Sequence, residues 1–62
     1  MKYRVYLTLD DGKSEHLIIQ HNQKNNAIAT LKNNKWVKDE ELGIIYNMDK
    51  VVSFQIEEIE EK

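Results

Sequence analysis

The sequence predicts a small α+β domain, an antiparallel sheet with one helix packed on one face, in the element order ββαβββ. Three observations predict it. Apolar and polar residues alternate on both sides of an early Asp-Gly step, the middle of the chain has apolar residues at helical spacing, and the second half returns to short apolar runs separated by turn residues. With 62 residues and no linker or repeat, the chain is expected to form one domain, 1–62.

An antiparallel hairpin is expected at the start of the chain. Apolar and polar side chains alternate over 3–9, which is the period of a half-buried strand. The segment 13–20 is expected to be the second strand. The Asp-Gly step at 11–12 lies between the two runs and is typical of a hairpin turn.

The length of this turn decides which residues pair. A two-residue loop pairs Val5 with Ile18, whereas a three-residue loop pairs Val5 with Leu17. The three-residue loop is favoured because it collects the apolar residues on one face and gives Gly12 the left-handed position of the turn, where glycine has no steric penalty. Tyr6 and Ile18 then lie on the opposite face of the sheet.

A short helix is expected in the middle of the chain. Ala27, Ile28 and Leu31 recur at the spacing of one helical face, and Asn22 is a suitable N-cap. The asparagines at 33–34 are able to supply the left-handed residue that ends a helix. A helix of about eleven residues is too short to be stable alone, so it must pack on the sheet.

The second half predicts three strands and an acidic end. Turn residues separate the runs, and the last run alternates Val52, Phe54 and Ile56 with more polar positions. The acidic segment 57–62 is expected to fray. The expected strands are 35–38, 44–46 and 51–57.

Composition limits the class of protein. The net charge of −2 counts against a general nucleic-acid-binding domain without excluding a local basic patch. The chain has no cysteine, so it has no disulfide and no thiolate metal site. The opening alternates where a signal peptide has an unbroken apolar run, and no run approaches the ~18 apolar residues of a membrane span. We therefore expect a soluble, cytoplasmic protein that does not contact membranes.

No set of residues has the pattern of a catalytic or metal site. His16 and His21 are five apart and are expected on opposite faces of an extended strand. The carboxylates fall in turns and at the acidic end, where water keeps them ordinary. Ser14 and Ser53 lack the nucleophile-elbow pattern, and two glycines are too few for a phosphate loop. The sequence predicts a protein that is not an enzyme and binds no cofactor.

Two surfaces are candidates for binding. Tyr6, Ile18 and Val51 are expected on the sheet face that the helix leaves open, where they indicate a protein partner or a homodimer. This reading leads by elimination, against the alternative that scattered apolar residues are normal on surfaces.

The second candidate surface is basic. Lys32, Lys35 and Lys38 surround Trp36, and an exposed tryptophan among lysines is able to stack on a single-stranded base while the lysines neutralise phosphate. The alternative is that Trp36 belongs to the core and the lysines form its solvated border. Nucleic acid is therefore the less favoured partner.

Most of the chain also resembles a group of small proteins. The matching features are the opening hairpin YRVYLTLDDGKSEHLII, the central Leu31, Trp36 and Val37, and the closing IIYNMDKVVSFQI. These features resemble small uncharacterised accessory proteins of low-GC Gram-positive bacteria and their phages and plasmids. The resemblance implies a cytoplasmic accessory protein, from a mobile element, that acts by binding and inhibiting a host protein or defence complex. It carries over no functional residues.

Overall fold

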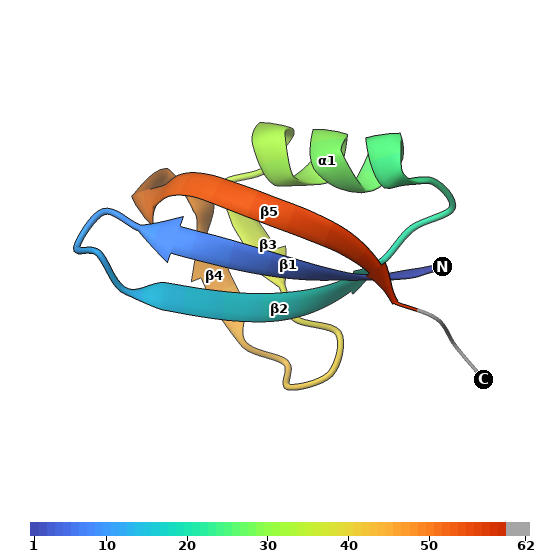
Figure 1. Ribbon diagram of the computed structural model, residues 1–62, viewed down its shortest axis with the longest axis horizontal. Helices are drawn as coiled ribbons and strands as arrows, with labels where there is room; N and C mark the ends of the chain where they lie inside the picture. The colour runs from blue at the N-terminus through green and yellow to red at the C-terminus, as the bar shows by residue number, and fades with distance from the viewer. Residues whose placement is uncertain (60–62) are drawn as a thin grey trace.

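The computed structural model describes residues 1–59 and contains the expected elements in the expected order (Figure 1). A short 3₁₀ helix, η1, occupies the turn expected before the last strand. The α+β class and the order ββαβββ are therefore confirmed. The elements are β1 (Lys2–Leu9), β2 (Ser14–Gln20), α1 (Lys24–Asn33), β3 (Trp36–Lys38), β4 (Ile45–Asn47), η1 (Met48–Lys50) and β5 (Val51–Ile59).

The first hairpin has the register that the three-residue loop requires. Val5 of β1 pairs with Leu17 of β2. The backbone N–H of Leu9 donates to the carbonyl of Lys13 at 2.8 Å and closes the loop. Gly12 has a φ of +86°, the left-handed conformation expected for it. The predicted turn is confirmed.

The strands are divided between two antiparallel sheets. The larger has the order β2-β1-β5, so that the last strand of the chain pairs with the first, and the smaller contains β3 and β4. The pairing of β1 with β5 shifts between Thr8, which pairs with Ser53, and Leu9, which pairs with Val51. Val52 is therefore the extra residue of a β-bulge.

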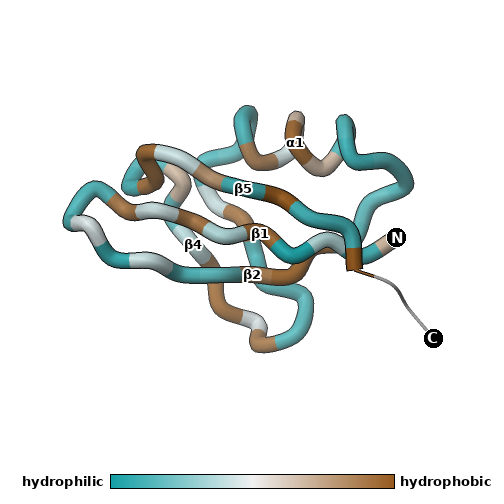
Figure 2. Tube along the Cα trace, viewed as in Figure 1, coloured by the Kyte–Doolittle hydropathy of each residue, from teal (hydrophilic) through white to brown (hydrophobic). Residues whose placement is uncertain are grey.

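One face of the larger sheet forms the core. α1 and the β3–β4 hairpin both pack against this face (Figure 1), and Figure 2 shows the alternation of apolar and polar residues along β1 that produces it. The sheet therefore has one buried and one solvated face, as expected for antiparallel strands. The buried cluster comprises Tyr3, Val5, Leu7, Leu17, Ile19, Ala27, Leu31 and Val37.

The ends of α1 differ from the sequence-based expectation. Its N-cap is Gln23, with no side-chain capping bond, and not Asn22. At the other end Asn34 is extended, with a φ of −113°, so the predicted left-handed residue is wrong. Instead the backbone N–H and side-chain Nδ2 of Asn34 both donate to the Thr30 carbonyl, at 3.2 and 2.9 Å. With such weak caps, the helix depends on burying Ala27 and its other apolar residues.

The acidic end begins inside β5. Glu57 pairs with Arg4 and Glu58 with Tyr3, and the strand continues to Ile59. Residues 57–59 therefore do not fray in the structure, because they pair with β1 as part of β5. The rest of the expected fraying end, 60–62, lies outside the described residues.

Candidate functional site

Ile18 does not lie on an open face. It is 5% exposed, because the segment after β3 folds back onto the edge of β2. The backbone N–H of Ile18 donates to Oδ1 of Asp39 at 3.3 Å, and its carbonyl accepts a hydrogen bond from the N–H of Glu40 at 2.8 Å. The prediction that Ile18 decorates an open sheet face is therefore wrong.

Val51 is also turned toward the core. The β-bulge changes the alternation of β5, so that Val51 lies opposite Leu9 and is half-buried against the core, while Val52 is exposed. A shift of one residue moves side chains to the other face of a sheet. The expected exposure of Val51 is wrong for this reason.

Tyr6 remains on the solvated face, 41% exposed, but its hydroxyl is engaged. It donates a hydrogen bond to Oε1 of Glu57 at 3.0 Å, and the same oxygen lies 3.7 Å from Nη1 of Arg4. The pKa of the Arg4 guanidinium is raised, first by its interaction with the Tyr6 side chain and then by the charges of Glu57 and Glu41. This face therefore presents a polar network and no apolar patch made of the three expected residues.

The β3–β4 hairpin carries the main group of exposed apolar side chains. Val37 and Tyr46 pair with each other and point toward the core, so the alternating positions Trp36 and Ile45 point outward. Trp36 is 58% exposed and Ile45 59% exposed. Trp36 is therefore not a core residue, and the alternative that placed it in the core is wrong.

Four of the seven large apolar side chains that are exposed in the described part of the chain belong to this hairpin and its loop. Figure 2 shows the apolar colour of the segment that leads into β4. Trp36 and Ile45 share one face of the hairpin, and we call this pair the hairpin surface. Leu42 and Ile44 are exposed in the adjoining loop.

The four residues of the predicted basic surface are divided between the β3–β4 hairpin and a separate groove beside α1. Lys38 is exposed and lies on the same face of β3 as Trp36. The Nζ atom of Lys35 lies 5.9 Å from the centre of the Trp36 ring, within reach of a cation–π interaction, and 3.6 Å from Oδ2 of Asp49. Lys32 lies in the last turn of α1 and lines a separate groove, which Lys35 also borders.

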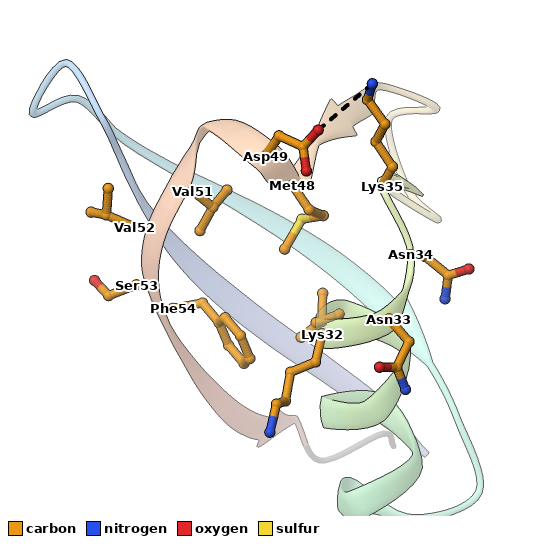
Figure 3. A pocket seen from close by; sticks show the side chains of 11 residues that line it. Lys32, Asn33, Asn34, Lys35, Met48, Asp49, Val51, Val52, Ser53 and Phe54 are labelled. Carbon is orange, nitrogen blue, oxygen red and sulfur yellow. Dashed lines mark ion pairs between the residues drawn. The ribbon is translucent and has the colours of Figure 1, made fainter.

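This groove has a volume of about 700 Å³ and lies between the end of α1, η1 and the first half of β5 (Figure 3). Its floor is apolar, formed by the buried Leu31 and the half-buried Met48, Val51 and Phe54. Figure 3 shows the Lys32 side chain extending along the groove beside the Phe54 ring. We call it the α1–β5 groove.

Sequence reasoning missed this groove, although element lengths indicate it. α1 has 10 residues and rises about 15 Å. β5 has 9 residues and extends about 30 Å. A helix of this length covers only part of the strand, so some apolar residues of β5 stay accessible.

The described part of the chain has no cluster of three or more His, Cys, Asp or Glu placed to hold a metal ion. In the same residues no helix combines the length and apolar character needed to cross a bilayer. The fold and its surfaces define a small α+β domain with an exposed apolar hairpin and a basic-rimmed groove. Comparisons with protein-family models, curated proteins and solved structures gave no significant match.

Proposed function

We propose that this chain is a non-enzymatic protein-interaction module whose contact site is the hairpin surface. The observation that carries the proposal is the exposure of Trp36 and Ile45 on the same face of one small hairpin. Tryptophan is enriched among the residues that dominate binding energy in protein interfaces. Large apolar side chains that gather on one surface mark an interaction site more often than single ones do.

The charges around the hairpin surface indicate the chemistry of the partner. Lys35 and Lys38 flank Trp36 in β3, whereas Glu40 and Glu41 follow at the other end of the hairpin. A partner that fits is a protein with an apolar patch, carboxylates on the side that meets Trp36, and a basic group on the side that meets the glutamates. Complementary charges of this kind orient the partner and accelerate association.

The wider biological role is proposed from the sequence resemblance alone. A module of this size, acting in the cytoplasm, would bind a host protein or a defence complex and inhibit it, as an accessory protein carried by a phage or plasmid. Such a role needs a contact surface, and the hairpin surface would supply it.

The test begins with capture of proteins on the immobilised chain from nuclease-treated lysate of a low-GC Gram-positive bacterium. Binding of the captured protein, once purified, is then measured by calorimetry against the wild type, Trp36→Ala and Ile45→Ala. Truncating Trp36 is expected to weaken binding by about 2 kcal/mol or more, which is roughly thirtyfold. Val52→Ala is the matched control, since Val52 is exposed but lies in β5.

Circular dichroism establishes that each variant is folded. Equal binding by the wild type, Trp36→Ala and Ile45→Ala would contradict the proposed site. Sedimentation of the purified chain tests whether it associates with itself. If it does, and if Trp36→Ala abolishes this association, the partner at the hairpin surface is a second copy of the chain.

A second candidate function is binding of single-stranded nucleic acid, and the exposure of Trp36 beside Lys35 and Lys38 favours it. Stacking of a base on Trp36 would quench its fluorescence, and the affinity would fall steeply with salt. The pairing of Lys35 with Asp49 weakens this candidate. Titration with an oligonucleotide at low salt tests it, and unchanged Trp36 fluorescence excludes this site.

A further inference from the structure

The two edges of the larger sheet differ. β2 forms one edge, and its outward polar groups are covered at Ile18 by Asp39 and Glu40, while the Tyr46 hydroxyl donates to the carbonyl of His16 at 3.3 Å. β5 forms the other edge, and within residues 1–59 it pairs with β1 alone. An open edge presents unpaired backbone N–H and C=O groups, which are able to pair with a strand of another chain.

The register identifies the unpaired backbone groups of β5. The backbone N–H of Leu9 donates to the carbonyl of Lys13, just before β2, and that of Asp10 donates to the carbonyl of Lys50, just before β5, each at 2.8 Å. Odd-numbered residues of β1 therefore face β2 and even-numbered ones face β5. Past the bulge, residues of β5 that pair with odd-numbered residues of β1 therefore direct their N–H and C=O groups away from the sheet. These residues are Phe54, Ile56 and Glu58.

The same three residues share a face. They lie opposite Leu7, Val5 and Tyr3 respectively, whose side chains are buried in the core, so all three are on the core side of the sheet. Phe54 and Ile56 are only partly covered there. Two apolar side chains and one carboxylate thus border the free edge, next to the α1–β5 groove.

We propose that the chain forms a homodimer in which the β5 edges of two copies pair antiparallel and join the two larger sheets into one. The register that fits centres the twofold axis on Ile56. Each Phe54 then lies opposite the second copy's Glu58, and the carboxylate of that Glu58 faces Lys32 in the α1–β5 groove. The pairing uses the outward backbone groups of all three residues of the edge.

Charge complementarity supports a second copy as the occupant. Lys32 borders the groove beside Phe54 and makes no ion pair with another described residue (Figure 3). The antiparallel register brings Glu58 of each copy to Lys32 of the other, twice by symmetry. A parallel arrangement would instead place the glutamates of the two strands side by side, and like charges on neighbouring strands are destabilising.

The proposal is independent of the proposed function, because the hairpin surface and the β5 edge share no residues. Sedimentation equilibrium over a range of concentrations is the test, with four chains compared: wild type, Glu58→Lys, Lys32→Glu and the double variant. The wild type is expected to dimerise. Each single variant should weaken the dimer by about tenfold or more, and the double variant should restore it, because the charge pair is then reversed.

Glu40→Lys makes the same charge reversal at an exposed residue far from the β5 edge and is the matched control. It should leave the dimer unchanged. Both Glu58 and Lys32 are exposed, so their variants are expected to fold, which circular dichroism checks. Three results would overturn the proposal: a monomeric wild type at every concentration, a dimer insensitive to both single variants, or a double variant that fails to recover.

Discussion

The carboxylate of Asp39 accepts a hydrogen bond from the backbone N–H of Ile18 in β2, at 3.3 Å. The same Oδ1 atom accepts the N–H of Glu41 at 2.9 Å, and Glu40 donates to the Ile18 carbonyl at 2.8 Å. Asp39 is only 1% exposed. One side chain thus holds the loop after β3 and covers the edge of β2, and this edge would otherwise present unpaired polar groups.

Asp39→Ala is expected to destabilise the fold by about 1–3 kcal/mol, because it leaves the buried N–H of Ile18 without a partner. Asp39→Asn keeps an acceptor oxygen and should cost less. Urea unfolding followed by circular dichroism measures both. Glu40→Ala is the control, since Glu40 contributes only backbone groups here, and an equal loss in Glu40→Ala and Asp39→Ala would contradict the assigned role.

Gly12→Ala is expected to lower the free energy of unfolding by about 1–2 kcal/mol, because an alanine at a φ of +86° is strained. Apart from its two chain neighbours, no described residue has an atom within 4 Å of the position that its Cβ would occupy, so the loss should come from the backbone alone. Gly12→Asn should cost less, since asparagine tolerates this conformation better. Thermal unfolding of the two variants decides this, and equal stabilities would refute the backbone explanation.

Leu7→Ala is expected to cost about 2–5 kcal/mol, because Leu7 is fully buried at the centre of the core. A domain of this size has a total stability of roughly 3–9 kcal/mol, so this variant should lose about half of the free energy of unfolding. Val52→Ala truncates an exposed side chain and should be nearly neutral. Urea unfolding of both variants measures their losses in free energy of unfolding. A small loss in Leu7→Ala would contradict the burial of Leu7 in the core.

Alkaline pH is expected to weaken the fold through Tyr46. Its pKa is raised above the usual 10.0, first by burial and then by the charges of Glu15 and Asp39. The unfolded chain loses this proton first, so the contribution of Tyr46 is complete below pH 10 and is lost as the pH rises through the higher folded pKa. Stability measured from pH 8 upward should therefore decline less steeply in Tyr46→Phe than in the wild type.

At neutral pH the same variant should lose about 1 kcal/mol, the contribution of the hydrogen bond from the Tyr46 hydroxyl to the carbonyl of His16. Tyr6→Phe is the comparison, since Tyr6 is exposed and its hydroxyl bonds to Glu57 at the surface. Identical alkaline profiles for Tyr46→Phe and the wild type would contradict this origin of the pH dependence.

Local features were predicted well because they depend on neighbouring residues. The register of the first hairpin follows from the alternation of apolar residues and from a single residue, Gly12, which suits a left-handed turn. The end of α1 was predicted less well. Asn33 and Asn34 permit a left-handed cap, but the chain enters β3 directly and Asn34 stays extended.

The exposure of individual side chains was predicted poorly. Ile18 is expected outside from alternation alone, but Asp39 and Glu40 cover it from a distant part of the chain. Val51 and Val52 exchange faces because a bulge shifts the register of β5 by one residue. Neither effect has a signal within the strand concerned.

The sequence by itself determined the class of the domain, the order of its elements and the first turn, because periodicity and glycine conformation act over a few residues. Only the tertiary structure decided that β5 pairs with β1, that Trp36 faces solvent, and that a groove opens beside Phe54. These features depend on contacts between segments far apart in the chain, where packing and hydrogen bonding of the backbone determine which faces and edges are covered.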